Sequence, residues 1–342
     1  TCSPFAFQPL SLADYRAPLL HPAGGYGIRC GLMSLRKRSC WIHAPAKINL
    51  TLEVLGRRSD GYHDIRSLMM PLALADCLEI SEADEEHFDV VADGVDLGEI
   101  WPANRNLAWR AAELVRQRAG VSQPLAVRLI KRIPIGGGLG GGSADAAAML
   151  VALSQLWKLG WSRQELMELG AELGSDVPGL VHGGAVCIEG RGERVTPACA
   201  EAGGWEPQWP VLLVNPGIAV STAEVYQTCS RSGVLTSETN FYNIVHSALL
   251  GGNLQAVAGG LFNSLEAGVF QKYPAIERIA QLLKAADAPG VLLSGSGATV
   301  FALVRDVEQG EQIRRDLPGG MWSRLTWTLP DGVMAAHGFL EP

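Results

Sequence analysis

Apolar and polar residues alternate along several short stretches in the first half of the chain. From Trp41 the pattern is strand-like, and between residues 48 and 54 apolar side chains take every second position, which predicts a β-strand followed by a loop at 56–63. Apolar stretches at 68–74 and 125–135 have the length and composition of further strands. The first half of the chain is therefore expected to build a β-sheet.

Two longer segments carry apolar residues at helical spacing. Residues 106–119 and 143–159 each place these residues on one stripe, as a helix packed on a core does. Ser162 followed by Glu165 forms a capping box, which predicts another helix that ends at Gly174.

A turn-rich segment at 196–210 separates these elements from a second set. Beyond it we expect a strand at 211–214, helices at about 240–250, 252–266 and 275–287, a strand-turn-strand around 291–304, a helix at 307–315 and a strand near 323–329. Helices mixed with short strands indicate an α+β or α/β fold. At about 150 residues per domain, 342 residues indicate two domains, which we place at 39–198 and 209–342.

Composition excludes several classes of protein. Hydrophobic residues make up 47% and charged residues 18%, so the chain can bury a core. The net charge of −7 argues against a nucleic-acid partner, and no run of 18 apolar residues indicates a membrane span. The seven cysteines are scattered and free of any C-x-x-C pair, which favours reduced thiols in a cytoplasm.

Residues 1–38 differ from the rest in their many prolines, weak periodicity and basic run at 36–38. We interpret them as a poorly ordered N-terminal extension upstream of Met33, with an organelle transit peptide as the alternative. Arginine outnumbers lysine 22 to 6, which favours a bacterial over a plastid source.

The most informative segment is a glycine-rich loop that leads into the helix expected at 143–159. Its residues are Pro134, Ile135, Gly136, Gly137, Gly138, Leu139, Gly140, Gly141, Gly142, Ser143 and Ala144. Without Cβ atoms the backbone can wrap closely round an anion, and the N-terminus of the following helix adds unpaired N–H groups. The loop is therefore expected to bind phosphate.

Other glycine-rich loops fit less well. A Walker A loop needs a lysine where Gly142 stands. The spacing of Gly136, Gly138 and Gly141 matches a dinucleotide fingerprint, but the acidic candidates that should end a second strand, Glu165 and Glu168, lie in a predicted helix. A flexible linker would not be held between an apolar strand and a periodic helix.

Three segments together resemble the motifs of the GHMP kinases, in the expected order. They are 134–145, 44–50 (Ala-Pro-Ala-Lys-Ile-Asn-Leu) and 293–301 (Leu-Ser-Gly-Ser-Gly-Ala-Thr-Val-Phe). The resemblance implies a two-domain α+β fold with the active site in the cleft between the domains, and it implies ATP and Mg²⁺ as cofactors.

Within that superfamily the chain is most similar to the kinases that phosphorylate 4-diphosphocytidyl-2-C-methyl-D-erythritol. The similarity spans about residues 41–305 and rests on Lys47-x-Asn49-Leu50 and on the segments 57–63, 174–178 and 263–266. The Gly-Tyr-His sequence at 61–63 is the discriminating part, while Gly179-Leu180 departs from the bulkier residues common there.

The resemblance assigns the chemistry. It implies that ATP phosphorylates the 2-hydroxyl of the cytidylyl substrate, with Asp176 as the base and Lys47 as its charged partner. A lysine beside an aspartate orients the carboxylate and can donate to the attacking oxygen. From spacing alone, the favoured interpretation is that Asp176 caps a helix and that Lys47 is a solvated strand residue.

Further roles follow from the same resemblance. Asn106 would lie near the ATP nucleoside or simply cap its helix, and Ser143 would cap a helix or contact phosphate or Mg²⁺, with no other protein ligand for the metal. Asp145 is expected to compensate the helix dipole.

A cytosine base needs an aromatic face and hydrogen bonds to its edge, which Tyr62, His63 and Tyr226 would supply. Asn49 and Thr222 would then contact the remainder of the acceptor.

Two alternatives remain open. The first is a GHMP kinase for another small alcohol such as mevalonate or a sugar, and the second is a nucleotide-binding sensor without catalysis. The sequence is compatible with a monomer or a homodimer.

Overall fold

A computed structural model describes residues 37–97, 105–198, 208–232 and 240–329. The strands are β1 (Ser39–Arg57), β2 (His63–Glu82), β3 (His87–Ala92), β4 (Leu125–Lys131), β5 (Val186–Gly190), β6 (Arg194–Pro197), β7 (Pro210–Asn215), β8 (Phe262–Asn263), β9 (Gly290–Leu293), β10 (Val300–Leu303) and β11 (Trp322–Trp327). The helices are α2 (Leu107–Ala119), α3 (Gly141–Leu156), α4 (Arg163–Leu173), α5 (Val177–His182), α6 (Thr222–Ser232), α7 (Phe241–Leu250), α8 (Leu254–Gly260), α9 (Glu266–Lys272), α10 (Pro274–Ala285) and α11 (Val307–Asp316).

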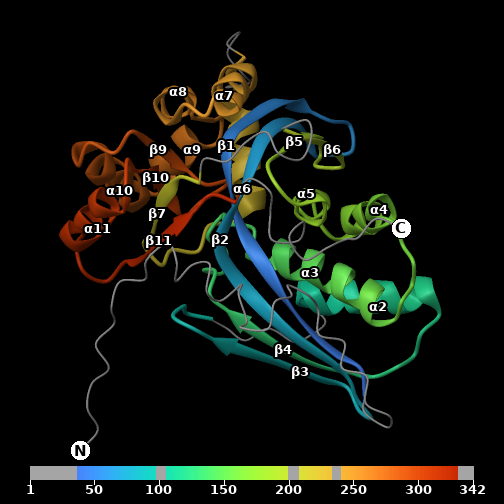
Figure 1. Cartoon of the computed structure of the whole chain (residues 1–342). Coiled ribbons are helices and arrows are strands. Elements are labelled where there is room, and N and C mark those ends of the chain that lie inside the picture. The colour runs from blue at the N-terminus through green and yellow to red at the C-terminus, as the bar shows by residue number, and fades with distance from the viewer. Residues whose placement is uncertain (1–36, 98–104, 199–207, 233–239, 330–342) are drawn as a thin grey trace, which may run out of the picture.

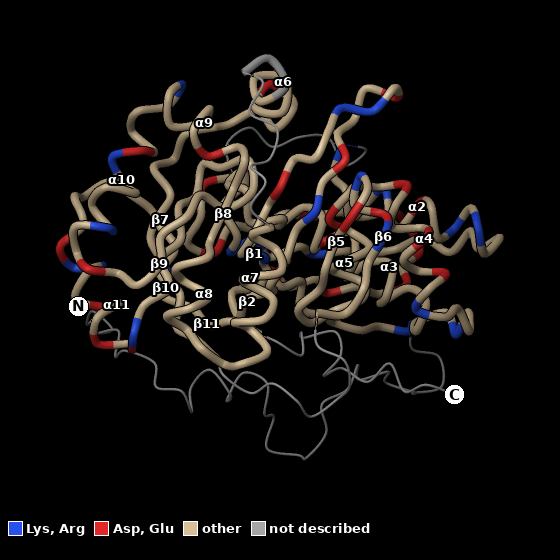
Figure 2. Tube along the Cα trace, turned by 90° about the horizontal axis from the view of Figure 1, so that it is seen from above, with Lys and Arg blue, Asp and Glu red and all other residues tan. Residues whose placement is uncertain are grey.

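The strands form two sheets, so the fold is α+β as predicted. The first has the order β3-β4-β2-β1-β8, with β5 paired to β2 and β6 paired to β5, and the second has the order β11-β7-β10-β9. Figure 1 shows the long strands β1 and β2 crossing the molecule, with α2 and α3 against the first sheet and α10 and α11 beside the second. Seen from above, charged residues of both signs lie mainly along the outer edges (Figure 2).

Strand β1 connects the hydrophobic cores of the molecule. Ile42 packs into the core under α2 and α3, Ile48 into the core between the two sheets, and Val54 into the core under α10. The pairing of β1 with β2 shifts register at three points, the first between Pro45 and Lys47. Such irregularities bend a strand and redirect its side chains, which lets one strand serve several cores.

Most of the predicted helices are confirmed. The capping box at Ser162 and Glu165 is present, with both reciprocal hydrogen bonds. The helix expected at 252–266 is wrong in its second half, because α8 ends at Gly260 and the next residues form β8, which pairs with β1. Helices α6 and α9 were not predicted from the sequence.

Gly179 explains one departure from the family pattern. A Cβ there would stand 2.7 Å from the Met69 methyl carbon and 2.9 Å from Ile188 Cδ1. These two side chains fill the space that a bulkier residue at position 179 would need.

The domain limits at 39–198 and 209–342 stay a prediction. The intervening residues 199–207 lie outside the described part of the chain, as do residues 1–36 of the predicted extension. Within the described residues, no helix has the length and apolar character needed to cross a membrane.

Candidate active site at the junction of the two domains

The glycine loop, residues 134–144, joins β4 to α3 in a conformation that requires glycine. Gly136, Gly138 and Gly140 have φ angles of 66°, 77° and 70°. This left-handed region costs a residue with a Cβ atom roughly 1–2 kcal/mol. Glycine at these three alternate positions therefore lets the backbone adopt the left-handed conformation without this cost.

The carbonyl groups of the loop face the protein. Three successive oxygens accept hydrogen bonds from other segments: Gly137 from the Thr299 N–H, Gly138 from the Ser294 hydroxyl and Leu139 from the Lys47 N–H. Within the described residues, the N–H groups of 136–143 donate to no backbone carbonyl. Since the carbonyls are occupied and the N–H groups are left over, the loop offers a binding site to an anion.

Helix α3 extends this anion site. Its N-cap is Gly140, which has no side chain to satisfy the first-turn N–H groups. Those groups and the positive end of the helix dipole therefore add to the loop. Ser143 lies inside the first turn, so the prediction that it caps the helix is wrong. Its hydroxyl oxygen faces Gly174, where a Cβ would stand 3.8 Å away.

A turn of the second domain, residues 294–297, packs directly on the glycine loop. A Cβ at Gly138 would stand 2.1 Å from the Ser294 carbonyl oxygen, a distance that no side chain tolerates. The hydroxyl groups of Ser296 and Thr222 lie 2.8 Å apart, which ties the turn to the start of α6. The two domains therefore meet at the glycine loop.

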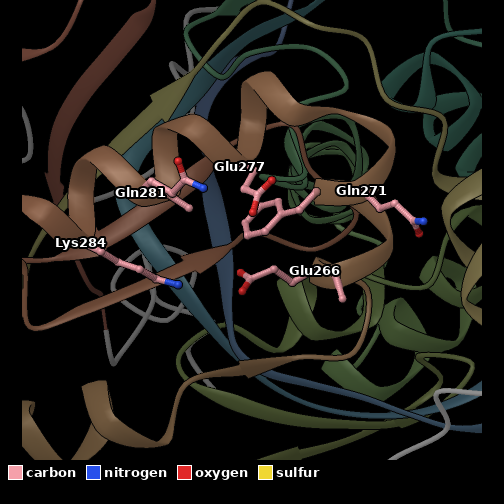
Figure 3. Close-up of a pocket in the computed structure, with 8 residues that line it drawn as sticks. Glu266, Gln271, Glu277, Gln281 and Lys284 are labelled. Atoms are coloured by element: carbon pink, nitrogen blue, oxygen red, sulfur yellow. The ribbon is translucent and has the colours of Figure 1, made fainter.

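Asn263 and Glu266 stabilise this turn through hydrogen bonds to the backbone of Leu293 and Gly295. The Asn263 amide donates to the carbonyls of Leu293 and Gly295 at 2.9 and 2.7 Å, and the Glu266 carboxylate accepts from the Leu293 N–H at 2.8 Å. Burial raises the pKa of Glu266. Glu266 also lines a groove between α9 and α10, and Figure 3 shows its carboxylate pointing toward the Lys284 ammonium. None of the residues that line this groove belongs to the 294–297 turn or to the glycine loop.

Lys47 brings a positive charge into the junction. Its side chain is 5% exposed, and its ammonium donates to Asn49 Oδ1 at 2.9 Å and lies 3.4 Å from Asp176 Oδ2. The Asn49 amide donates in turn to the Ser67 hydroxyl at 2.8 Å, which fixes the orientation of Asn49. A Cβ at Gly140 would stand 2.8 Å from Lys47 Cγ, so the glycine loop lies directly on the lysine.

Asp176 stands at the N-cap position of α5, but its carboxylate makes no capping hydrogen bond. The side chain faces Lys47 and is 33% exposed, which leaves it accessible to a molecule bound at the junction. Burial, and then the negative charge of Asp176, raises the pKa of Tyr226.

Two of the three aromatic residues singled out in the sequence, His63 and Tyr226, lie against each other. The rings of His63 and Tyr226 lie 5.3 Å apart between centroids, a contact distance, so no base fits between these two rings in this arrangement. Burial and the nearby Arg57 lower the pKa of His63, which favours the neutral imidazole. Tyr62 is 56% exposed, and the Arg191 guanidinium carbon lies 5.0 Å from its ring centre. Tyr62 therefore presents an open aromatic surface backed by a cation.

Asn106 caps α2, because its Oδ1 accepts from the Ala108 N–H at 2.9 Å. The ordinary cap interpretation is thus confirmed, and any contact with a nucleotide would be additional. The start of α2 nevertheless adjoins the loop, since a Cβ at Gly142 would stand 3.5 Å from Leu107 Cδ1.

Asp145 differs from the expectation that it compensates the dipole of its helix. Helix α3 begins at Gly141, two residues earlier than predicted, so Asp145 is its fifth residue and turns into the interior. Its carboxylate accepts from Lys131 at 2.6 Å and is 2% exposed. Burial raises the pKa of Asp145 to about 8, although the charge of Lys131 opposes the shift.

Known proteins resemble this chain over most of its length. The family models for the N-terminal and the C-terminal domain of GHMP kinases match residues 106–190 and 245–321. A 4-diphosphocytidyl-2-C-methyl-D-erythritol kinase of Pelotomaculum thermopropionicum is 42% identical over 79% of this chain and 91% of its own length. The enzyme of the same name from Bacillus pumilus is 40% identical over 81% of this chain and 92% of its own length. This chain belongs to the 4-diphosphocytidyl-2-C-methyl-D-erythritol kinase family.

A solved structure of this family has the same fold. The crystal structure of a 4-(cytidine 5'-diphospho)-2C-methyl-D-erythritol kinase superposes with a TM-score of 0.68 at 32% identity and covers 84% of this chain and 99% of its own. The GHMP kinase motifs recognised in the sequence are therefore the segments that meet at the domain junction.

Two residues of this GHMP kinase junction escaped the sequence analysis. Arg191 lies on the turn between β5 and β6, far in sequence from Tyr62, and a single arginine in a polar turn gives no signal. Lys131, beneath the glycine loop, resembled any charged residue at the end of a strand. Asn263 belongs to a recognised motif, but its part in supporting the 294–297 turn depends on three-dimensional contacts.

Substitution within the glycine loop should separate close packing from backbone strain. We expect Gly138→Ala to weaken MgATP binding by at least about 100-fold, because its Cβ must displace the Ser294 carbonyl as well as adopt a left-handed φ. Gly136→Ala is the matched control, since its φ is also positive but no atom lies within 4 Å of its Cβ position. Isothermal titration calorimetry on both variants gives the comparison. Equal losses in the two variants would show that packing on the turn is irrelevant.

Proposed function

We propose that this chain is an ATP-dependent kinase that phosphorylates the 2-hydroxyl of 4-diphosphocytidyl-2-C-methyl-D-erythritol, a step of the non-mevalonate route to isoprenoids. The observation that carries the proposal is the ion pair of Lys47 and Asp176 at 3.4 Å, directly beside a glycine loop whose N–H groups are free for phosphate. Phosphoryl transfer requires mainly positioning and neutralisation of charge, and this junction supplies both.

Asp176 accepts the proton of the acceptor hydroxyl. The acceptor oxygen then forms its bond to the γ-phosphorus while the bond from phosphorus to the β–γ bridging oxygen breaks, and ADP leaves. The Lys47 ammonium donates to the attacking oxygen or to the γ-phosphate, and Asn49 keeps it aimed there through the 2.9 Å hydrogen bond. Asn49 therefore acts first through Lys47, in addition to any contact with the acceptor.

The triphosphate lies along 134–144, and the nucleoside extends toward Asn106 at the start of α2. The proximity of Leu107 to Gly142 supports this direction. Mg²⁺ neutralises the triphosphate charge when bound. Ser143 fits as its protein ligand, because its hydroxyl lies in the first turn of α3 and faces Gly174, two residues before Asp176. The phosphate oxygens and water would complete the coordination.

The cytidine end of the acceptor lies at the aromatic residues. Tyr62 offers the exposed ring for stacking, the neutral His63 offers hydrogen bonds to the base edge, and Tyr226 closes the site near Asp176. Thr222, which is joined to the 294–297 turn by its contact with Ser296, would contact the erythritol or diphosphate end of the acceptor. Arg191 backs the Tyr62 ring and adds positive charge where a diphosphate would pass.

We also infer a cytoplasmic enzyme of bacterial type, because the relatives that match most of the chain come from bacteria. The choice between monomer and homodimer stays a prediction.

An ADP-release assay tests the acceptor. Mg-ATP would be offered with the cytidylyl substrate, mevalonate, homoserine and galactose in parallel. Turnover confined to the cytidylyl substrate is expected. Turnover of another alcohol would be compatible with the catalytic role of Lys47 and Asp176 but would contradict a cytosine site at the aromatic residues. ATP binding without turnover would favour the alternative of a nucleotide-binding sensor.

The base assignment predicts a split between turnover and binding. Asp176→Asn should lower kcat by at least about 100-fold and leave both KM values within about threefold, because a carboxamide cannot accept the proton. Glu172→Gln, which removes the carboxylate of an exposed ion pair on α4, should leave kcat unchanged. Steady-state kinetics with a thermal melt of each variant provides the check. A kcat near wild type in Asp176→Asn would remove the base assignment.

Stacking on Tyr62 predicts an effect on one substrate alone. Tyr62→Ala should raise the KM of the cytidylyl substrate about tenfold or more while the KM of ATP stays within about twofold, since a stacked base contributes roughly 1–3 kcal/mol. Tyr62→Phe keeps the ring and should behave as wild type. Equal changes in the two KM values would argue against a cytosine site at Tyr62.

A further inference from the structure

A buried cluster of charges lies beneath the glycine loop, and the mechanism above does not use it. It consists of Asp76 on β2, Lys131 at the end of β4 and Asp145 on α3, each at most 5% exposed. The Lys131 ammonium donates to both carboxylates, to Asp145 at 2.6 Å. We call these three residues the loop clamp.

The loop clamp contacts the glycine loop at its start. Asp76 Oδ1 accepts from the N–H groups of Arg132 and Ile133 at 2.5 and 2.9 Å. These are the last two residues before Pro134, so one carboxylate fixes the backbone that leads into the loop.

The loop clamp also contacts the far end of the loop. Asp145 lies in the second turn of α3. Gly141, the first residue of that helix, lies directly against Lys131. A Cβ at Gly141 would stand 3.3 Å from the Lys131 ammonium and 3.0 Å from Ile133 Cγ2. A single ammonium therefore connects the strand before the loop to the helix after it.

Asp145 is poorly suited to a purely stabilising role. Its Oδ1 is buried and accepts from no donor among the described residues, and the nearby Asp76 carboxylate disfavours a negative charge on Asp145. An unsatisfied buried polar atom costs about 1–3 kcal/mol, and a buried ion pair is often no more stable than an apolar replacement. Without Asp145, Lys131 would still be paired with Asp76. What Asp145 adds is a fixed position for α3 relative to β4.

We propose that the loop clamp sets the distance between the two ends of the glycine loop, and that Asp145 is a positioning residue for ATP binding. The inference rests on the proposed role of this loop as the ATP site. Seven residues, 134–140, separate Ile133 from Gly141, and most of them are glycines with wide conformational freedom. Holding both ends lowers the entropy that the loop loses when it closes on phosphate.

The test compares two replacements of Asp145 in the full chain. Asp145→Leu removes the contact with Lys131 and also the unsatisfied oxygen. Asp145→Asn keeps an oxygen that accepts from Lys131. We expect Asp145→Leu to weaken MgATP binding at least tenfold in isothermal titration calorimetry while its Tm stays at or above that of wild type. Asp145→Asn should restore MgATP binding to within threefold of wild type.

Glu53 provides a matched control in the same sheet. Its carboxylate is fully buried, accepts from Arg66 at 2.9 Å and also leaves one oxygen without a partner among the described residues, but it lies away from the glycine loop. Glu53→Leu should leave the Kd of MgATP within twofold of wild type.

Three outcomes would overturn the clamp: MgATP affinity within twofold of wild type in Asp145→Leu, equal losses in Asp145→Leu and Asp145→Asn, or an equal loss in Glu53→Leu. Cytidine 5'-diphosphate, titrated in parallel, keeps the two proposals distinct. Failure of wild type to bind it would contradict the proposed acceptor, while the MgATP series still decides the clamp.

Discussion

The whole junction depends on one buried ammonium, that of Lys47. A charge with 5% of its side chain exposed must have partners, and it finds them in Asn49 of its own strand and Asp176 of the loop before α5. The backbone N–H of the same lysine holds the Leu139 carbonyl, and its side chain is covered by Gly140. A single residue thus connects β1, the glycine loop and the proposed base, so a displacement of β1 would disturb all three together.

Glycine makes the close contact between the domains possible. The turn 294–297 reaches the loop only because Gly138 lacks a Cβ, and the carbonyl groups that this contact occupies leave the loop N–H groups for phosphate. Asn263 stabilises the turn, and the loop clamp contacts the two ends of the glycine loop. The carbonyl groups of the loop therefore make the packing contacts, while its N–H groups would bind phosphate in the proposed complex.

The sequence was sufficient for the parts of the fold that local patterns encode. The strand at 48–54, the helix capped by Asn106 and the capping box at Ser162 follow from periodicity and caps, and the family motifs supplied the glycine loop and the Lys47–Asp176 pair. Contacts between distant segments could not be predicted in the same way. Asp145 was expected to compensate the dipole of its helix, yet it is buried beside Lys131. The pairing of β8 with β1 ends the helix that periodicity extended to 266.

A crystal structure with Mg²⁺, a non-hydrolysable ATP analogue and the cytidylyl substrate would test the central claim most directly. The account predicts phosphate oxygens on the N–H groups of 136–143 and cytosine against Tyr62. It also predicts the acceptor 2-hydroxyl within hydrogen-bond distance of the Asp176 carboxylate and in line with the γ-phosphorus. A complex in which that hydroxyl lies away from Asp176, or in which the phosphates bind elsewhere than the glycine loop, would contradict it.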